Sequence, residues 1–206
     1  MVRVFLLSAF VGLLSVNGFA DVVTLFVDDE PGLGEDLSND SMNPTQLGVL
    51  PVGQSQVLGV LFNVESDNDP DIFTFNVAPN QTLDSITVSI EGDRHFFGLD
   101  AGPTSVDPNT GNGSDLLIAA LIGGNTGNLL IPGNIDIDYG GSGVTTPLGP
   151  GDYTIWIQET AVDDLYPYTV TFETSVAAVP EPSSLALFCI AGAVVGCRRR
   201  RRKPLV

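Results

Sequence analysis

Short runs in which apolar and polar residues alternate constrain this chain more than any other feature of its sequence. In one of these runs, Phe73, Phe75 and Val77 share a face opposite Thr74 and Asn76. Alternation of this kind predicts strands with one buried face. Strands are predicted over residues 22–27, 56–64, 71–77, 83–91, 116–122, 153–160 and 168–174, between turns rich in Gly, Pro, Asn and Asp. No run in this part of the chain has a helical period, so we predict an all-β fold, an antiparallel β-sandwich or jelly-roll-like single domain.

Opposite charges are separated along the chain. All 25 acidic residues lie between Asp21 and Glu181, where Arg94 is the only cation, so this stretch carries a net charge of −24. A surface of that charge repels the phosphates of nucleic acids and of anionic lipids. We therefore expect no nucleic-acid partner for the acidic domain.

The N-terminus has the three parts of a secretory signal peptide. Arg3 is followed by an apolar run over residues 4–16, and Gly18 and Ala20 provide the small residues of a cleavage site before Asp21. The alternative, a permanent N-terminal membrane anchor, needs a longer apolar run. We expect cleavage between Ala20 and Asp21, which would place the acidic domain outside the cytoplasm.

The C-terminus combines an apolar segment with a block of cations. Residues 183–197 hold no charge and would span about 22 Å as a helix, which is short for a membrane span. The cations that follow are Arg198, Arg199, Arg200, Arg201, Arg202 and Lys203. Such a block stops transfer and stays on the cytoplasmic side, so we predict a transient inner-membrane anchor with a cytoplasmic C-terminus. The alternative is a buried core helix with a basic tail.

These features divide the chain into five parts. They are a signal peptide (1–20), an acidic β-sandwich domain (21–176), a linker (177–182), a transmembrane helix (183–197) and a basic cytoplasmic tail (198–206).

The linker, the apolar segment and the basic block together resemble the PEP-CTERM protein-sorting signal. Pro180, Glu181 and Pro182 match the motif that gives this signal its name, and the other two parts follow in the same order. The resemblance implies that an exosortase, an integral-membrane cysteine transpeptidase, recognises these three residues and removes the tail. It also implies a link to exopolysaccharide and the biofilm matrix. Two prolines in three residues hold the chain extended, which suits binding in an enzyme groove.

Parts of the acidic domain resemble bacterial pre-peptidase C-terminal domains. The sequence LGPGDYTIWIQET over residues 148–160, with YTVTF shortly after it, is similar to the last two strands of that family, and DPDIFTFNV over residues 69–77 is similar to an earlier strand. This resemblance implies a β-sandwich accessory domain without chemistry of its own.

Two groups of oxygen-bearing side chains are candidate calcium ligands. One is Asp67, Asp69 and Asp71, and the other is Asp107, Asn109 and Asp115. Calcium takes carboxylate and amide oxygens from flexible loops, although the EF-hand spacing is not met. The alternative is a pair of solvated acidic turns. A bound cation would relieve the self-repulsion of the acidic domain, so Ca²⁺ is the one cofactor that we consider.

Two aromatic side chains are candidates for other roles. Trp156 lies on the polar face of its predicted strand, where an indole could form a platform for a sugar ring. The alternative is that a second layer or a loop covers the ring. His95 could act as a general base only with a nucleophile and an orienting partner, which the sequence does not show.

We therefore expect an exported surface or matrix protein, not an enzyme, with a structural or adhesive role and extracellular polysaccharide as a candidate partner. The first alternative is a calcium-dependent carbohydrate-binding module. The second is a polysaccharide-degrading enzyme that works with carboxylates alone, because acid pairs are abundant in this chain.

Overall fold

The computed structural model describes residues 21–28, 35–64, 67–105, 113–134, 137–138, 141–160 and 165–177. The strands are β1 (Val23–Val27), β2 (Thr45–Val49), β3 (Gly53–Val64), β4 (Asp67–Asn68), β5 (Asp71–Val77), β6 (Gln81–Ala101), β7 (Ile118–Asn125), β8 (Ile137–Asp138), β9 (Gly151–Gln158) and β10 (Leu165–Val176). Two 3₁₀ turns, η1 (Gly113–Asp115) and η2 (Pro132–Asn134), flank β7. The prediction of an all-β fold is confirmed.

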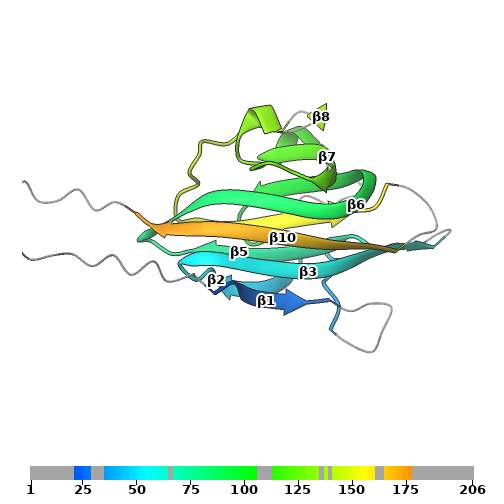
Figure 1. The fold of residues 1–206 in the computed structure, drawn as a ribbon, viewed down its shortest axis with the longest axis horizontal. Coiled ribbons are helices and arrows are strands. Elements are labelled where there is room, and N and C mark those ends of the chain that lie inside the picture. The colour runs from blue at the N-terminus through cyan, green and yellow to red at the C-terminus, as the bar shows by residue number, and fades with distance from the viewer. Residues whose placement is uncertain are drawn as a thin grey trace, which may run out of the picture.

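The strands form one continuous sheet that curls into a near-barrel (Figure 1). Its main path runs β1-β3-β10-β6-β9-β5-β2, with β4, β7 and β8 paired outside this path. Most pairs are antiparallel as predicted, but the two strands at the ends of the path pair in parallel, β1 with β3 and β2 with β5.

The long strand β6 carries the sheet from one layer to the other. Its first half pairs with β10, and its second half pairs with β9. Between the halves, Gly92 and Arg94 have φ values of 88° and 77°, and the register against β7 shifts between Ile90 and His95. A bulge of this kind bends a strand without ending it. The sequence predicted an end at residue 91, because the segment from Gly92 to Arg94 resembles a turn.

The core lies between the two layers. Phe75 of β5 and Phe172 of β10 are not in neighbouring strands, yet their ring centroids are 4.9 Å apart. Phe75 also stacks on Tyr153 of β9. Phe75 belongs to the face that alternation marked as apolar, and the predicted burial of Phe73, Phe75 and Val77 is confirmed.

The two ends of the domain lie together. Ser55 of β3 is paired with Val23 of β1 on one side and with Phe172 of β10 on the other. Because β1 begins where β10 ends, Asp21 and Ala177 leave the sheet at the same pole (Figure 1).

Beyond this sheet, the predicted signal peptide and the segment that follows residue 177 lie outside the described residues. Within the described residues, no helix is long and apolar enough to cross a membrane.

Candidate functional site

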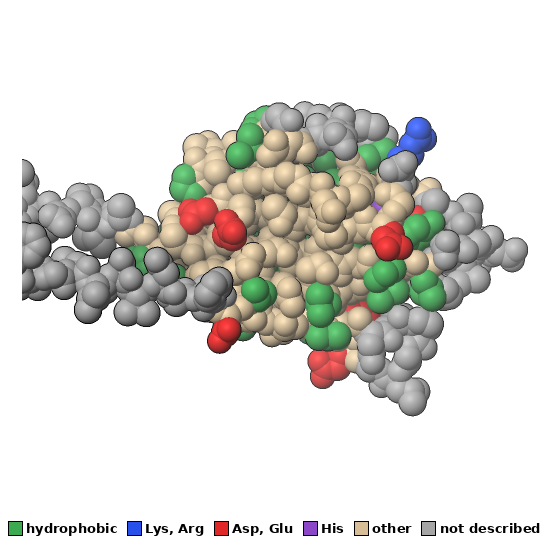
Figure 2. Space-filling view, in the orientation of Figure 1, with side chains coloured by type: hydrophobic (Ala, Val, Ile, Leu, Met, Phe, Trp, Pro, Cys, Tyr) green, Lys and Arg blue, Asp and Glu red, His purple; other side chains and the backbone are tan. Residues whose placement is uncertain are grey.

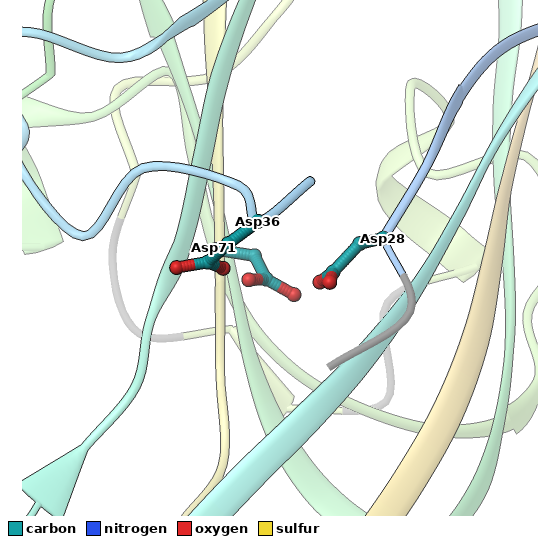
Figure 3. A group of neighbouring side chains, drawn as sticks. All are labelled: Asp28, Asp36 and Asp71. Carbon is teal, nitrogen blue, oxygen red and sulfur yellow. The ribbon is translucent and has the colours of Figure 1, made fainter. Parts of the chain in front are cut away.

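Three aspartates from three separate segments meet where the two ends of the sheet approach each other. Asp28 directly follows β1, Asp36 precedes β2, and Asp71 is the first residue of β5. One carboxylate oxygen from each lies within 4.8 Å of the others (Figure 3). Because β1 and β5 are not neighbours in the sheet, this carboxylate cluster joins its opposite sides.

Backbone hydrogen bonds hold each segment of the carboxylate cluster in place. The Asp28 N–H donates to the carbonyl of Leu58 in β3, at 2.9 Å. The Ile72 N–H donates to the carbonyl of Ser38, also at 2.9 Å, which forms an isolated β-bridge between the Asp36 segment and β5. Backbone pairing therefore fixes Asp28 on β3 and fixes the Asp36 segment on β5.

The three carboxylates differ in their exposure to solvent. Asp71 is 0% exposed and Asp28 is 3% exposed, whereas Asp36 is open to solvent. Burial raises the pKa of Asp71 well above its usual range, and the charges of Asp28, Asp69 and Asp36 raise it further. Carboxylate oxygens in such an arrangement are suited to a hard cation, which would be reached from the Asp36 side.

Tyr168 of β10 faces the same place. Its side chain is 3% exposed, and its ring lies over Gly59 in the neighbouring strand. The hydroxyl is close enough to Asp71 to favour the charged carboxylate and so lower its pKa, against the stronger effect of burial. The pair does not have the geometry of a full hydrogen bond, so neither the Tyr168 hydroxyl nor either Asp71 oxygen has a hydrogen-bond partner among the described residues.

Of the predicted calcium ligands whose side chains the structure describes, which are Asp69, Asp71 and Asp115, only Asp71 belongs to this cluster. Asp69 is half-buried and acts on Asp71 through its charge, and the side chain of Asp67 lies outside the described residues. In the second predicted group, Asp107 and Asn109 lie outside the described residues and Asp115 is exposed in η1.

Sequence reasoning missed Asp28 and Asp36 because they are far from Asp71 along the chain. Only the closure of the sheet brings them together. The available signal was an acidic residue directly after the first strand, which a sequence this rich in acids hides.

Trp156 is covered. Its side chain is 8% exposed, and its ring centroid lies 4.4 Å from that of Phe96. Both belong to a small apolar cluster with Ile72, Leu116 and Ala119. This environment favours the packing role that the sequence left open over a sugar platform.

His95 forms a second buried group, with Glu159. The His95 Nδ1 lies 3.7 Å from a Glu159 carboxylate oxygen, and Nε2 lies 2.9 Å from the carbonyl of Glu91. The ring also meets the edge of Tyr166. These contacts join the bend of β6 to the residue after β9.

On the face drawn in Figure 2, the acidic side chains of the described residues are dispersed. Figure 2 shows them scattered over one face of the domain, without a single acidic patch. The carboxylate cluster is distinguished by its burial and by the closeness of its oxygens.

Comparison with known proteins places the C-terminal segment. A family model described as the PEP-CTERM protein-sorting motif matches residues 178–202. The match includes Pro180, Glu181 and Pro182 and most of the basic block, and it confirms the predicted sorting signal. It indicates an exported protein that an exosortase processes.

No curated protein matches the chain significantly. The likeness of the acidic domain to pre-peptidase C-terminal domains stays a prediction.

Proposed function

We propose that this protein is a structural or adhesive component of the cell surface or extracellular matrix, delivered by an exosortase and associated with exopolysaccharide or biofilm. The observation that carries the proposal is the sorting motif at residues 178–202. A chain sorted in this way presents the domain that precedes the motif, and here that domain is an acidic near-barrel with a packed core.

The non-enzymatic part of the proposal rests on what the described groups do. Trp156 is used in packing, and His95 is used in the bend of β6. The carboxylate cluster consists of three aspartates whose oxygens lie within 4.8 Å of one another. This arrangement suits cation binding better than glycoside hydrolysis, in which an acid and a base act from either side of the sugar bond.

The first experiment tests sorting. Replacing Pro180, Glu181 and Pro182 together with alanine should leave an uncut, membrane-retained chain, because the motif that the exosortase binds is gone. Cell fractionation and immunoblotting measure this, with a Pro79→Ala variant, at an exposed position inside the domain, as the control. Normal release of the triple variant would remove the basis of the proposal.

The second experiment tests the role. Deletion of the gene should reduce matrix retention or cell adhesion, and the wild-type chain should restore it whereas the triple variant should not. If the purified protein breaks down the polysaccharide of the cells that produce it, and a single carboxylate substitution abolishes this activity, the result would instead support an enzyme.

Calcium-dependent carbohydrate binding is a second candidate, favoured by the carboxylate cluster alone. Glycan-array binding that a chelator abolishes would support it.

A further inference from the structure

Asp71 is a buried acid whose position is unexplained by the fold itself. It is 0% exposed at the start of β5, and neither of its carboxylate oxygens has a hydrogen-bond partner among the described residues. Burying a carboxylate without hydrogen bonds or a counter-charge is costly, and buried charges in proteins are paired or coordinate metals. A cation or a hydrogen-bond donor that binds both oxygens would make the burial of this carboxylate favourable.

A second buried polar side chain lies beside Asp71. Tyr168 belongs to β10, which pairs with β3 and not with β5. Its hydroxyl also has no hydrogen-bond partner among the described residues. Buried tyrosine hydroxyls usually find a partner. Its ring reaches the carboxylates across Gly59, which leaves room for it by having no side chain.

The remaining charges at this point are also acidic. Asp28 and Asp36 bring carboxylate oxygens within 4.8 Å of the Asp71 oxygen. Like charges this close repel one another, and a cation removes that repulsion. Asp28 after β1 and Asp71 in β5 would then both be attracted to the ion, which would draw these two parts of the sheet together.

We propose that Asp28, Asp36 and Asp71 bind a divalent cation, and that this cation is Ca²⁺. Two oxygens on opposite sides of one Ca²⁺ are about 5 Å apart, which is the span of the carboxylate cluster. Calcium accepts irregular arrangements of about six to eight oxygens, whereas Mg²⁺ demands a regular octahedron and retains its waters. Tyr168 lies outside the ligands and next to Asp71, where its hydroxyl would orient that carboxylate once the ion is bound.

The site would close the sheet. β1 is bonded to β3, and β5 is bonded to β9 and β2, so no strand pairing joins β1 to β5 directly. A cation held by Asp28 and Asp71 supplies that connection. Because the ligands come from the domain alone, this inference does not depend on how the chain is sorted.

The experiment uses the full chain, purified in mild detergent and freed of metals with a chelator. We expect calorimetric titration to show one Ca²⁺ bound per chain. Ca²⁺ at about a hundredfold excess over its Kd should raise the melting temperature by about 5–10 °C, and Mg²⁺ or NaCl at matched ionic strength should raise it much less. Equal shifts with Ca²⁺ and Mg²⁺ would overturn the proposal.

Variants locate the ion. Asp36→Asn, an isosteric change at an exposed position, should fold normally and lose at least tenfold in Ca²⁺ affinity, and Asp71→Asn should lose binding. The matched controls are Asp115→Asn and the double variant Asp67→Asn with Asp69→Asn, which should keep most of the affinity. Loss of binding in the double variant, with binding kept by Asp36→Asn and Asp71→Asn, would place the ion elsewhere and overturn the assignment.

Terbium provides a readout that a purely structural role would not change. Tb³⁺ binds calcium sites and emits when excited through a nearby tyrosine. We expect Tyr168→Phe to lose most of this sensitised emission while keeping its fold by circular dichroism. Unchanged emission would exclude the ion from the neighbourhood of Tyr168.

Discussion

The Tyr168 ring lies directly over Gly59 in the neighbouring strand, so closely that a Cβ atom on Gly59 would lie 2.3 Å from the Tyr168 Cζ. The two residues are paired across β10 and β3, and the missing side chain of one is the space that the other occupies. This pairing positions the Tyr168 hydroxyl at the carboxylate cluster.

Gly59→Ala should therefore destabilise the domain. The added methyl group forces the Tyr168 ring out of its position, and overpacking in a closed interior costs about 1–3 kcal/mol. Chemical denaturation measures the free energy of unfolding. Gly149→Ala is the control, because a Cβ there meets nothing within 4 Å, and it should change the free energy by less than about 0.5 kcal/mol. Equal effects of the two changes would contradict the packing described.

The metal-free domain should lose stability as pH rises above about 4. The unfolded chain releases the Asp71 proton near its ordinary pKa of 3.8, whereas burial raises the folded-state pKa well above that value. The folded state thus binds more protons between the two values, and its stability falls with rising pH until the folded-state pKa is passed. Melting temperatures measured with chelator present at a series of pH values would show this decline.

Asp71→Asn removes the titrating group. In chelator at neutral pH, the variant should be more stable than the wild type, because no charge is buried. The decline with pH should become shallower. A less stable Asp71→Asn domain at neutral pH would show that the charged carboxylate has a favourable partner even without metal.

Trp156 should behave as a buried indole. It is the only tryptophan of the chain, so its fluorescence reports on this position alone. We expect short-wavelength emission that iodide quenches poorly, and a shift to longer wavelength in denaturant. If the folded protein emits at the wavelength of the denatured protein, or if added polysaccharide quenches its emission, the sugar-platform alternative would be restored.

The exported form should begin at Asp21 and lack the block from Arg198 to Lys203. Both ends carry signals that processing enzymes remove, and the sorting motif covers most of the basic block. Mass spectrometry of the extracellular protein would measure both ends. Peptides that contain Arg198 in that fraction would contradict removal of the tail.

The strands with clear alternation could be predicted from the sequence, and β2 could not. In β5 and β10 the apolar residues repeat every second position. Burial follows that repeat in β10, whereas in β5 it extends to both faces, since Ile72 and Thr74 are buried too. β2 contains Gly48 at a φ of 79° and an exposed Val49, and it pairs in parallel with a strand more than twenty residues away. Its pairing is a long-range property that local residue preferences do not encode.

The candidate site was predictable only in part, for the same reason. Asp71 was marked by its acidic neighbours, but its closest charged partners come from segments more than thirty residues earlier. Alternating acids in one loop suggested ligands from that loop. The structure instead draws one acid from each of three segments, and such a set is defined by sheet closure.

The shared pole of the two chain ends has a mechanical consequence. A protein attached through the residues after β10 is pulled at that pole, and β1 starts beside the point of pulling. Force that peels β1 away would be transmitted along it to Asp28, at its far end. A calcium ion held between Asp28 and Asp71 would then resist the separation of β1 from the rest of the domain, and the force needed to unfold the domain would rise with the calcium concentration.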